Sequence, residues 1–99
     1  MSKADKTIEN WRTTKGSNAV VSRQDIVKVL EDKFADYREP NNTTGSHRYK
    51  IRHEIFKEFS FSASDGMITI PIKAKNVKRF YADRLLKVLD LIEETKGEQ

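Results

Sequence analysis

Hydrophobic residues recur at the three- and four-residue intervals of an amphipathic helix in two segments of the chain. The first helix is predicted over residues 23–34, with Ser22 as its N-cap and Asp25 three positions on, as in a capping box. The second is capped by Asn76 and continues to Glu94, and Gly97 marks its end. The positions that define the two apolar faces are Ile26, Val27, Leu30 and Phe34 in the first helix and Phe80, Tyr81, Leu85, Val88, Leu89 and Ile92 in the second.

Between these helices, polar and apolar residues alternate, as they do in strands whose successive side chains point to opposite faces. We expect one strand over residues 46–53, a less regular one over residues 56–62, a hairpin turn over residues 62–66 and a strand over residues 67–71, which Pro71 ends. In the first strand, one face carries Ser46, Arg48, Lys50 and Arg52, and the other carries His47, Tyr49, Ile51 and His53.

The order helix, strands, helix predicts an α+β domain in which two helices pack on one face of a three-stranded antiparallel sheet. The domain is expected to occupy residues 20–96, and the polar residues 1–19 are interpreted as a flexible N-terminal extension. Trp11 is the exception in that extension, and we expect its ring to dock on the domain. Tyr37 is expected on a short strand before a loop over residues 39–45.

The composition excludes several classes of protein. The chain has no Cys, so it has no disulfide framework, thiolate zinc site or cysteine nucleophile. Its apolar runs, residues 68–72 and 85–92, are far shorter than the about 20 residues of a membrane span. Residues 1–6 lack the apolar segment of a secretory signal. We therefore expect a cytoplasmic protein with no membrane contact and no cofactor.

The distribution of charge indicates more than its total. The chain has 19 Lys and Arg against 15 Asp and Glu, a net charge of +4. Residues 46–52 contain three cations and no anion, residues 71–81 contain a second run of cations, and the acids gather in residues 31–39 and 93–98. A segregated basic face is typical of nucleic-acid binders, although a solvated charged face without a ligand has the same composition.

A candidate site lies where these cations meet a titratable group, in the sequence from Gly45 to Ile51. Gly45 permits a close backbone approach, Ser46 and His47 can handle protons, and Arg48 and Lys50 can hold an anion such as a phosphodiester. No metal site is expected, because His47 and His53 on one strand would lie about 20 Å apart, too far to share an ion.

The chain resembles the HicA family of bacterial toxin ribonucleases over residues 22–94. The resemblance rests on the leading helix, on Gly45-Ser46-His47 with Tyr49, on Thr69-Ile70-Pro71, and on the basic stretch that leads into the last helix. It implies a double-stranded-RNA-binding-domain-like fold, cleavage of mRNA, and inhibition by a HicB-type antitoxin. Two features depart from the family: Arg48 replaces a second histidine, and the chain is longer at its N-terminus and between residues 53 and 66.

Cleavage of RNA would use the substrate's own 2′-OH as nucleophile. A neutral imidazole with a pKa of about 6.5 suits a general base, so His47, which matches the family's catalytic histidine, is expected to act as base or as acid on the leaving oxygen, with Ser46 orienting groups. The residues expected to bind RNA are Gly45, Arg48, Tyr49, Lys50, Lys73, Lys75 and Lys78, although Tyr49 could instead pack in the sheet.

Two other functions remain open from the sequence. The same fold and basic face could bind structured RNA without cutting it, with His47 in a structural role. A third possibility is an interaction domain that binds a protein partner and holds RNA only weakly.

Overall fold

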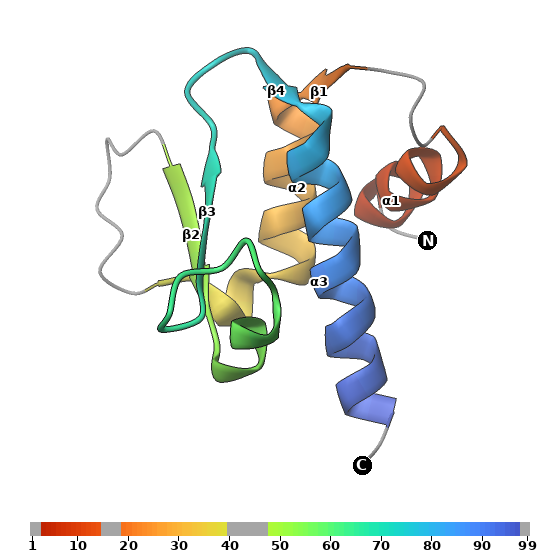
Figure 1. Cartoon of the computed structure of the whole chain (residues 1–99). Coiled ribbons are helices and arrows are strands. Elements are labelled where there is room, and N and C mark those ends of the chain that lie inside the picture. The colour runs from red at the N-terminus through yellow and green to blue at the C-terminus, as the bar shows by residue number, and fades with distance from the viewer. Residues whose placement is uncertain (1–2, 15–18, 40–47, 98–99) are drawn as a thin grey trace.

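The computed structural model describes residues 3–14, 19–39 and 48–97, and Figure 1 shows how their elements are arranged. No helix in this part of the chain is long and apolar enough to cross a membrane. In chain order the elements are α1 (Lys3–Thr13), β1 (Val20–Ser22), α2 (Arg23–Lys33), the 3-10 helix η1 (Ala35–Tyr37), β2 (Arg48–Arg52), the 3-10 helix η2 (Glu54–Glu58), β3 (Met67–Pro71), β4 (Asn76–Lys78) and α3 (Arg79–Gly97).

The strands form two antiparallel ladders. β1 pairs with β4, with Val20 opposite Lys78, and β2 pairs with β3, with Arg48 opposite Pro71. Because α2 follows β1 directly and α3 follows β4 directly, the first ladder places the start of both helices together. In Figure 1 the β2–β3 ladder lies on one side of α2 and α3, and α1 lies on the other.

One hydrophobic cluster joins all these layers. The helices contribute Ile26 and Leu30 from α2 and Leu85 and Val88 from α3, all at most 1% exposed. The inward face of the second ladder contributes Tyr49, Ile51, Ile68 and Ile70. Fully burying such a side chain stabilises the fold by roughly 1.5–3 kcal/mol, so this cluster fixes which face of the β2–β3 ladder points outward.

The structure confirms both predicted helices and a turn at Gly66, but this turn does not join two strands of a hairpin, because residues 54–58 form the 3-10 helix η2. Ser22 caps α2, where its Oγ accepts a hydrogen bond from the Gln24 N–H at 3.1 Å. The last helix begins at Arg79, because residues 76–78 pair with β1 as a strand instead of starting the helix. In the turn, Gly66 has a φ of 81°, and a Cβ there would lie 2.2 Å from the His53 carbonyl oxygen.

The predicted three-stranded sheet is wrong in its middle strand. Residues 54–58 form η2, which His53 caps by accepting a hydrogen bond from the Ile55 N–H through Nδ1, and the Phe59 and Phe61 rings stack at 4.9 Å. On the other edge of β2, Arg38 makes an isolated antiparallel bridge with Ile51. Tyr37 belongs to η1 and not to a strand. The observed fold is therefore α+β with antiparallel pairing, in two short ladders.

The N-terminal segment also differs from the expected flexible extension, because Lys3–Thr13 forms α1. Ala4, Ile8 and Trp11 lie on one face of this helix and are buried, which confirms that Trp11 docks on the domain. Two ion pairs flank the apolar contact, each with an N–O distance of 2.7 Å. They join Lys33 to Asp5 of α1 and Arg12 of α1 to Asp90. These hydrogen-bonded carboxylates raise the pKa of Lys33 and of Arg12.

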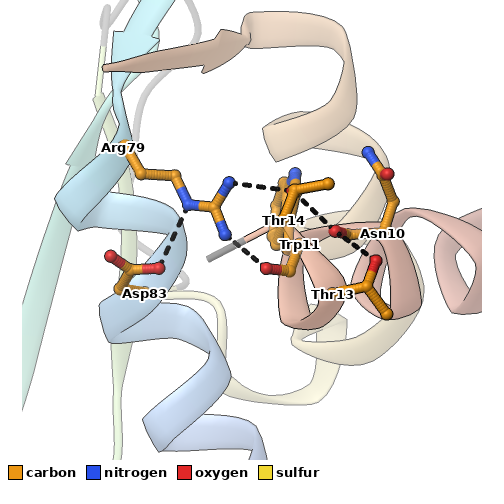
Figure 2. A network of polar contacts seen from close by, with 6 residues as sticks. All are labelled: Asn10, Trp11, Thr13, Thr14, Arg79 and Asp83. Atoms are coloured by element: carbon orange, nitrogen blue, oxygen red, sulfur yellow. Dashed lines mark hydrogen bonds and ion pairs between the residues drawn. The ribbon is translucent and has the colours of Figure 1, made fainter. Parts of the chain in front are cut away.

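A buried arginine holds the end of α1 against the start of α3 (Figure 2). Arg79 is 5% exposed, and its guanidinium donates to the Trp11 carbonyl oxygen, to the Thr14 hydroxyl at 3.3 Å and to Asp83 at 3.1 Å. Its backbone N–H donates to the Ala19 carbonyl oxygen at 2.9 Å. The Trp11 carbonyl is among the last in α1, where helical partners are lacking and a positive charge is favourable.

Arg79→Met is expected to lower the free energy of unfolding by about 2–3 kcal/mol, because it leaves the Trp11 carbonyl without its charged donor. Urea denaturation followed by circular dichroism and by Trp11 fluorescence measures this change. Arg12→Met is the matched control: it removes an ion pair whose side chains are 42% and 55% exposed, and should cost at most about 1 kcal/mol. Equal losses in the two variants would contradict the role given to Arg79.

Candidate nucleic-acid interface

The outward face of the β2–β3 ladder carries the cations that the alternation predicted. Arg48 and Arg52 are exposed and Lys50 is half-buried, whereas Tyr49 and Ile51 between them are buried. The described part of the strand, residues 48–52, thus confirms the predicted assignment of faces. Opposite Arg48, Lys50 and Arg52 on β3 lie Pro71, Thr69 and Met67, none of which is charged.

The two ends of this face differ in charge. At one end, Arg52 is balanced by carboxylates, with Glu39 at 2.5 Å and Asp65 at 3.5 Å. At the other end, Arg48 lies opposite Pro71, and the chain continues from Pro71 into the exposed Lys73 and Lys75. The exposed lysines that follow Pro71 therefore add positive charge at this end of the ladder, and that charge can attract an anion.

Arg23 fixes the position of the segment that carries these lysines. Its backbone N–H donates to the Lys75 carbonyl oxygen at 3.0 Å, and its guanidinium donates to the Lys73 carbonyl oxygen at 3.4 Å. A pocket of about 460 Å³ lies beside this contact, lined by Ser22, Arg23, Gln24, Lys75 and Asn76. It adjoins the N-terminus of α2, the positive end of the helix dipole, so the local field favours an anion.

We call Arg48, Lys50, Lys73, Lys75 and Lys78 the basic surface. Register and chain connectivity bring its members to one side of the β2–β3 ladder and along the 73–78 segment, which ends in β4. In the described ranges, none of Lys73, Lys75 and Lys78 makes an ion pair with a carboxylate, so their charge is available to a ligand. Gly45, Ser46 and His47, the other candidate residues, lie outside the described residues.

Tyr49 has a different environment from the other candidates. Its ring is 2% exposed and faces the core, and the Arg38 guanidinium lies 4.9 Å from the ring centroid. In this position the ring cannot stack on a base, and it occupies the sheet-packing role that the sequence left open. Burial raises the pKa of Tyr49, the negative charge of Glu31 raises it further, and Arg38 opposes both.

Sequence reasoning missed two residues near the basic surface. Arg23 was assigned only to the start of a helix, and its role depends on a contact with residues 50 positions away. Phe80 was counted on the apolar face of the last helix, yet it is 42% exposed. The pairing of β1 with β4 positions both Arg23 and Phe80, and this pairing leaves no local pattern in the sequence. The charge of Arg23 was the only sign of its role.

Comparisons with models of known protein families, with curated proteins and with solved structures find no match for this chain. Across the ranges that the structure describes, no group of three His, Asp or Glu side chains could hold a metal ion.

Tyr49→Phe is expected to preserve or raise stability near neutral pH by up to about 1 kcal/mol, because the buried hydroxyl has no hydrogen-bond partner among the described residues. The raised pKa of Tyr49 gives a second expectation. Above the ordinary tyrosine pKa of about 10, the unfolded chain releases a proton that the folded chain retains, so stability falls as pH rises.

The variant should therefore lose less stability than the wild type between about pH 8 and about pH 11. Urea denaturation at both pH values measures the difference, with Tyr81→Phe as the control at a half-buried tyrosine. A large loss of stability at neutral pH would show instead that the hydroxyl makes a necessary hydrogen bond.

Proposed function

We propose that this protein is an RNA-cleaving toxin of the HicA kind, which binds RNA through the basic surface and cleaves it with His47. The observation that carries the proposal is the register of β2 and β3. It places Arg48, the residue directly after His47 in the sequence, opposite Pro71, from which the chain leads to Lys73 and Lys75. Cations from two separate segments would then act on one phosphate group and its neighbours.

The reaction needs few protein groups. His47 would accept the proton of the 2′-OH, whose oxygen attacks the adjacent phosphorus, and the bond to the 5′-oxygen would break, with that oxygen taking a proton from water, to give a cyclic 2′,3′-phosphate and a 5′-OH end. In the alternative assignment, His47 protonates the leaving 5′-oxygen. Arg48, Lys50 and Lys73 would stabilise the charge that develops on the phosphoryl oxygens, and Ser46 and Gly45 would orient and admit the backbone of the substrate.

The family resemblance gains support from strand pairing. The segments that carry it, Gly45 to Tyr49 and Thr69 to Pro71, are distant in sequence, and their described parts pair directly, Arg48 with Pro71 and Tyr49 with Ile70. We extend the proposal to a double-stranded-RNA-binding-domain-like fold, to a cytoplasmic site of action and to a HicB-type antitoxin as the partner. No metal or other cofactor takes part in the proposed reaction.

A second candidate is an RNA-binding module that does not cut. The observation that favours it is the make-up of the basic surface, whose members are one arginine and four lysines, with no histidine or carboxylate among them. Such a surface is sufficient for contacts with phosphates. The two candidates share the binding surface and differ only in what His47 does.

Purified protein is expected to cut RNA in the presence of EDTA, and a 2′-deoxy substitution at the scissile nucleotide should block the cut, because the nucleophile is then missing. His47→Ala should lower the single-turnover cleavage rate by roughly 10²- to 10⁴-fold. Gel analysis of end-labelled RNA measures these rates. His53→Ala is the matched control, since His53 caps η2, and it should retain cleavage.

Three results would overturn parts of this proposal. Cutting of the deoxy substrate would exclude attack by the 2′-OH. Normal cleavage by His47→Ala would exclude His47 as the catalytic residue. Binding of RNA without any cleavage by the wild-type protein would favour the non-catalytic module.

Replacing single cations of the basic surface should weaken RNA binding in a salt-dependent way. Lys73→Ala, Lys75→Ala and Lys78→Ala should each reduce the slope of log K against log salt concentration by about 0.7 for single-stranded RNA, because each removes one phosphate contact. Fluorescence anisotropy over a series of salt concentrations measures the slope. Lys87→Ala, in a pocket shared with Asp83 and Asp90, should leave it unchanged, and an equal change there would contradict the assigned surface.

A further inference from the structure

Phe80 presents an exposed aromatic ring at the edge of the basic surface. It lies in the first turn of α3, two residues after Lys78, and is 42% exposed. A pocket of about 290 Å³ lies beside it, and the residues of its lining that matter here are Pro71, Asn76, Lys78, Phe80 and Tyr81. This volume is at the small end of the about 300–1,000 Å³ typical of small-molecule sites, which suits a single planar group.

The ring of Phe80 is held by its neighbours on one side. The Tyr81 ring centroid lies 4.2 Å away, and the Arg84 guanidinium lies 4.6 Å from the Phe80 ring and 5.5 Å from the Tyr81 ring. Because the Arg84 guanidinium is also close to the Tyr81 ring, these two groups do not stand directly opposite each other across Phe80, and the 42% exposure of Phe80 leaves part of its ring open to solvent. The guanidinium is itself fixed by the Phe61 ring at 5.1 Å. Phe80 is therefore a preorganised stacking surface with a free side.

The charge around the pocket favours an anionic ligand. Lys78 is the only charged side chain among the described residues that line it, and no carboxylate is present among them. The segment that leads into the pocket carries Lys73 and Lys75, both exposed. An aromatic face, the amide of Asn76 and an ammonium group thus converge, which are the groups that recognise the ring, the edge and the phosphate of a nucleotide.

A protein partner is a weaker match for this surface. The other large exposed apolar residue in the described ranges is Val20, at 46%. Lys78 pairs with Val20 across the β1–β4 ladder and precedes Phe80 by two residues, so a cation separates the two apolar groups. Surfaces that dock proteins through hydrophobic contact are usually continuous apolar patches rather than interrupted ones.

We propose that this pocket binds one unpaired base of single-stranded RNA, stacked on the free side of Phe80, with Asn76 at the base edge and Lys78 on an adjoining phosphate. The inference rests on the proposed function, because it takes RNA as the ligand. It adds that the base is unpaired at this position, because a base within a duplex reaches the ring only after it has been unpaired and flipped out of its stack.

The test compares two fluorescent single-stranded RNA probes of equal length and charge, an oligoadenylate and the same backbone with abasic sites. Wild-type protein should bind the oligoadenylate more tightly. Phe80→Ala should weaken binding of the oligoadenylate by roughly 5- to 150-fold and leave the abasic probe unaffected, because only the base contact is lost. Val20→Ala, at the other exposed apolar residue, is the matched control and should bind both probes normally.

A second measurement does not depend on the folding of Phe80→Ala. In Phe80→Trp, the new indole should be quenched when oligoadenylate is added and not when the abasic probe is added, whereas Trp11 of the wild type, at 2% exposure, should respond to neither. Equal quenching by both probes, or none, would overturn the stacking site.

The outcomes distinguish a failure of the stacking site from a failure of the proposed function. Failure of the wild-type protein to bind either probe would overturn the proposed function together with the stacking site. Equal binding of both probes, unchanged by Phe80→Ala, would overturn the stacking site and leave RNA binding through phosphates intact. Loss of self-association in Phe80→Ala, measured by sedimentation, with normal RNA binding would assign Phe80 to an interface between protein chains instead.

Discussion

The buried guanidinium of Arg79 is the interaction on which the arrangement of the helices depends. It donates to the Trp11 carbonyl in the last turn of α1, pairs with Asp83 in α3, and belongs to the residue at which the chain passes from β4 into α3. A buried cation is costly unless its donors are matched, and here they are matched by three acceptors, which belong to α1, to Thr14 just after it and to α3. Leaving the guanidinium donors without acceptors would be costly, so this contact selects one position for α1. The small apolar face of α1, formed by Ala4, Ile8 and Trp11, would define that position less precisely without it.

The same junction positions the basic surface. Because β4 begins at Asn76 and pairs with β1, the chain between Pro71 and Asn76 must span from one ladder to the other. Lys73 and Lys75 lie on that connection, and Arg23 binds its carbonyl groups from the start of α2. The cations are thus placed by backbone contacts rather than by their own side chains, which leaves their ammonium groups available for a ligand.

The sequence predicted the elements that have a strong local pattern and missed those that depend on distant partners. α2, α3, the turn at Gly66 and the faces of β2 follow from periodicity, capping and turn chemistry. α1 was missed because its polar composition hides a short apolar face, and β1 and β4 because three residues carry too little pattern without knowledge of their pairing. Residues 56–62 were misassigned to a strand because Phe59 and Phe61 have the two-residue spacing of side chains on one face of a strand. In the structure these two side chains stack on each other without strand pairing.

Binding and cleavage make separate demands on this fold. The cations are carried by strands and by a connection that Arg23 holds, so they would be present whether or not the protein cuts RNA. The proposed cleavage would add one requirement, a proton acceptor beside the 2′-OH, and the candidate for it is His47, which precedes β2 in the sequence. His53 is not equivalent, because its Nδ1 accepts a backbone hydrogen bond from Ile55 and its ring packs on Tyr37. In the proposed nuclease, a change at His47 alone would therefore remove cleavage and leave the basic surface unaltered.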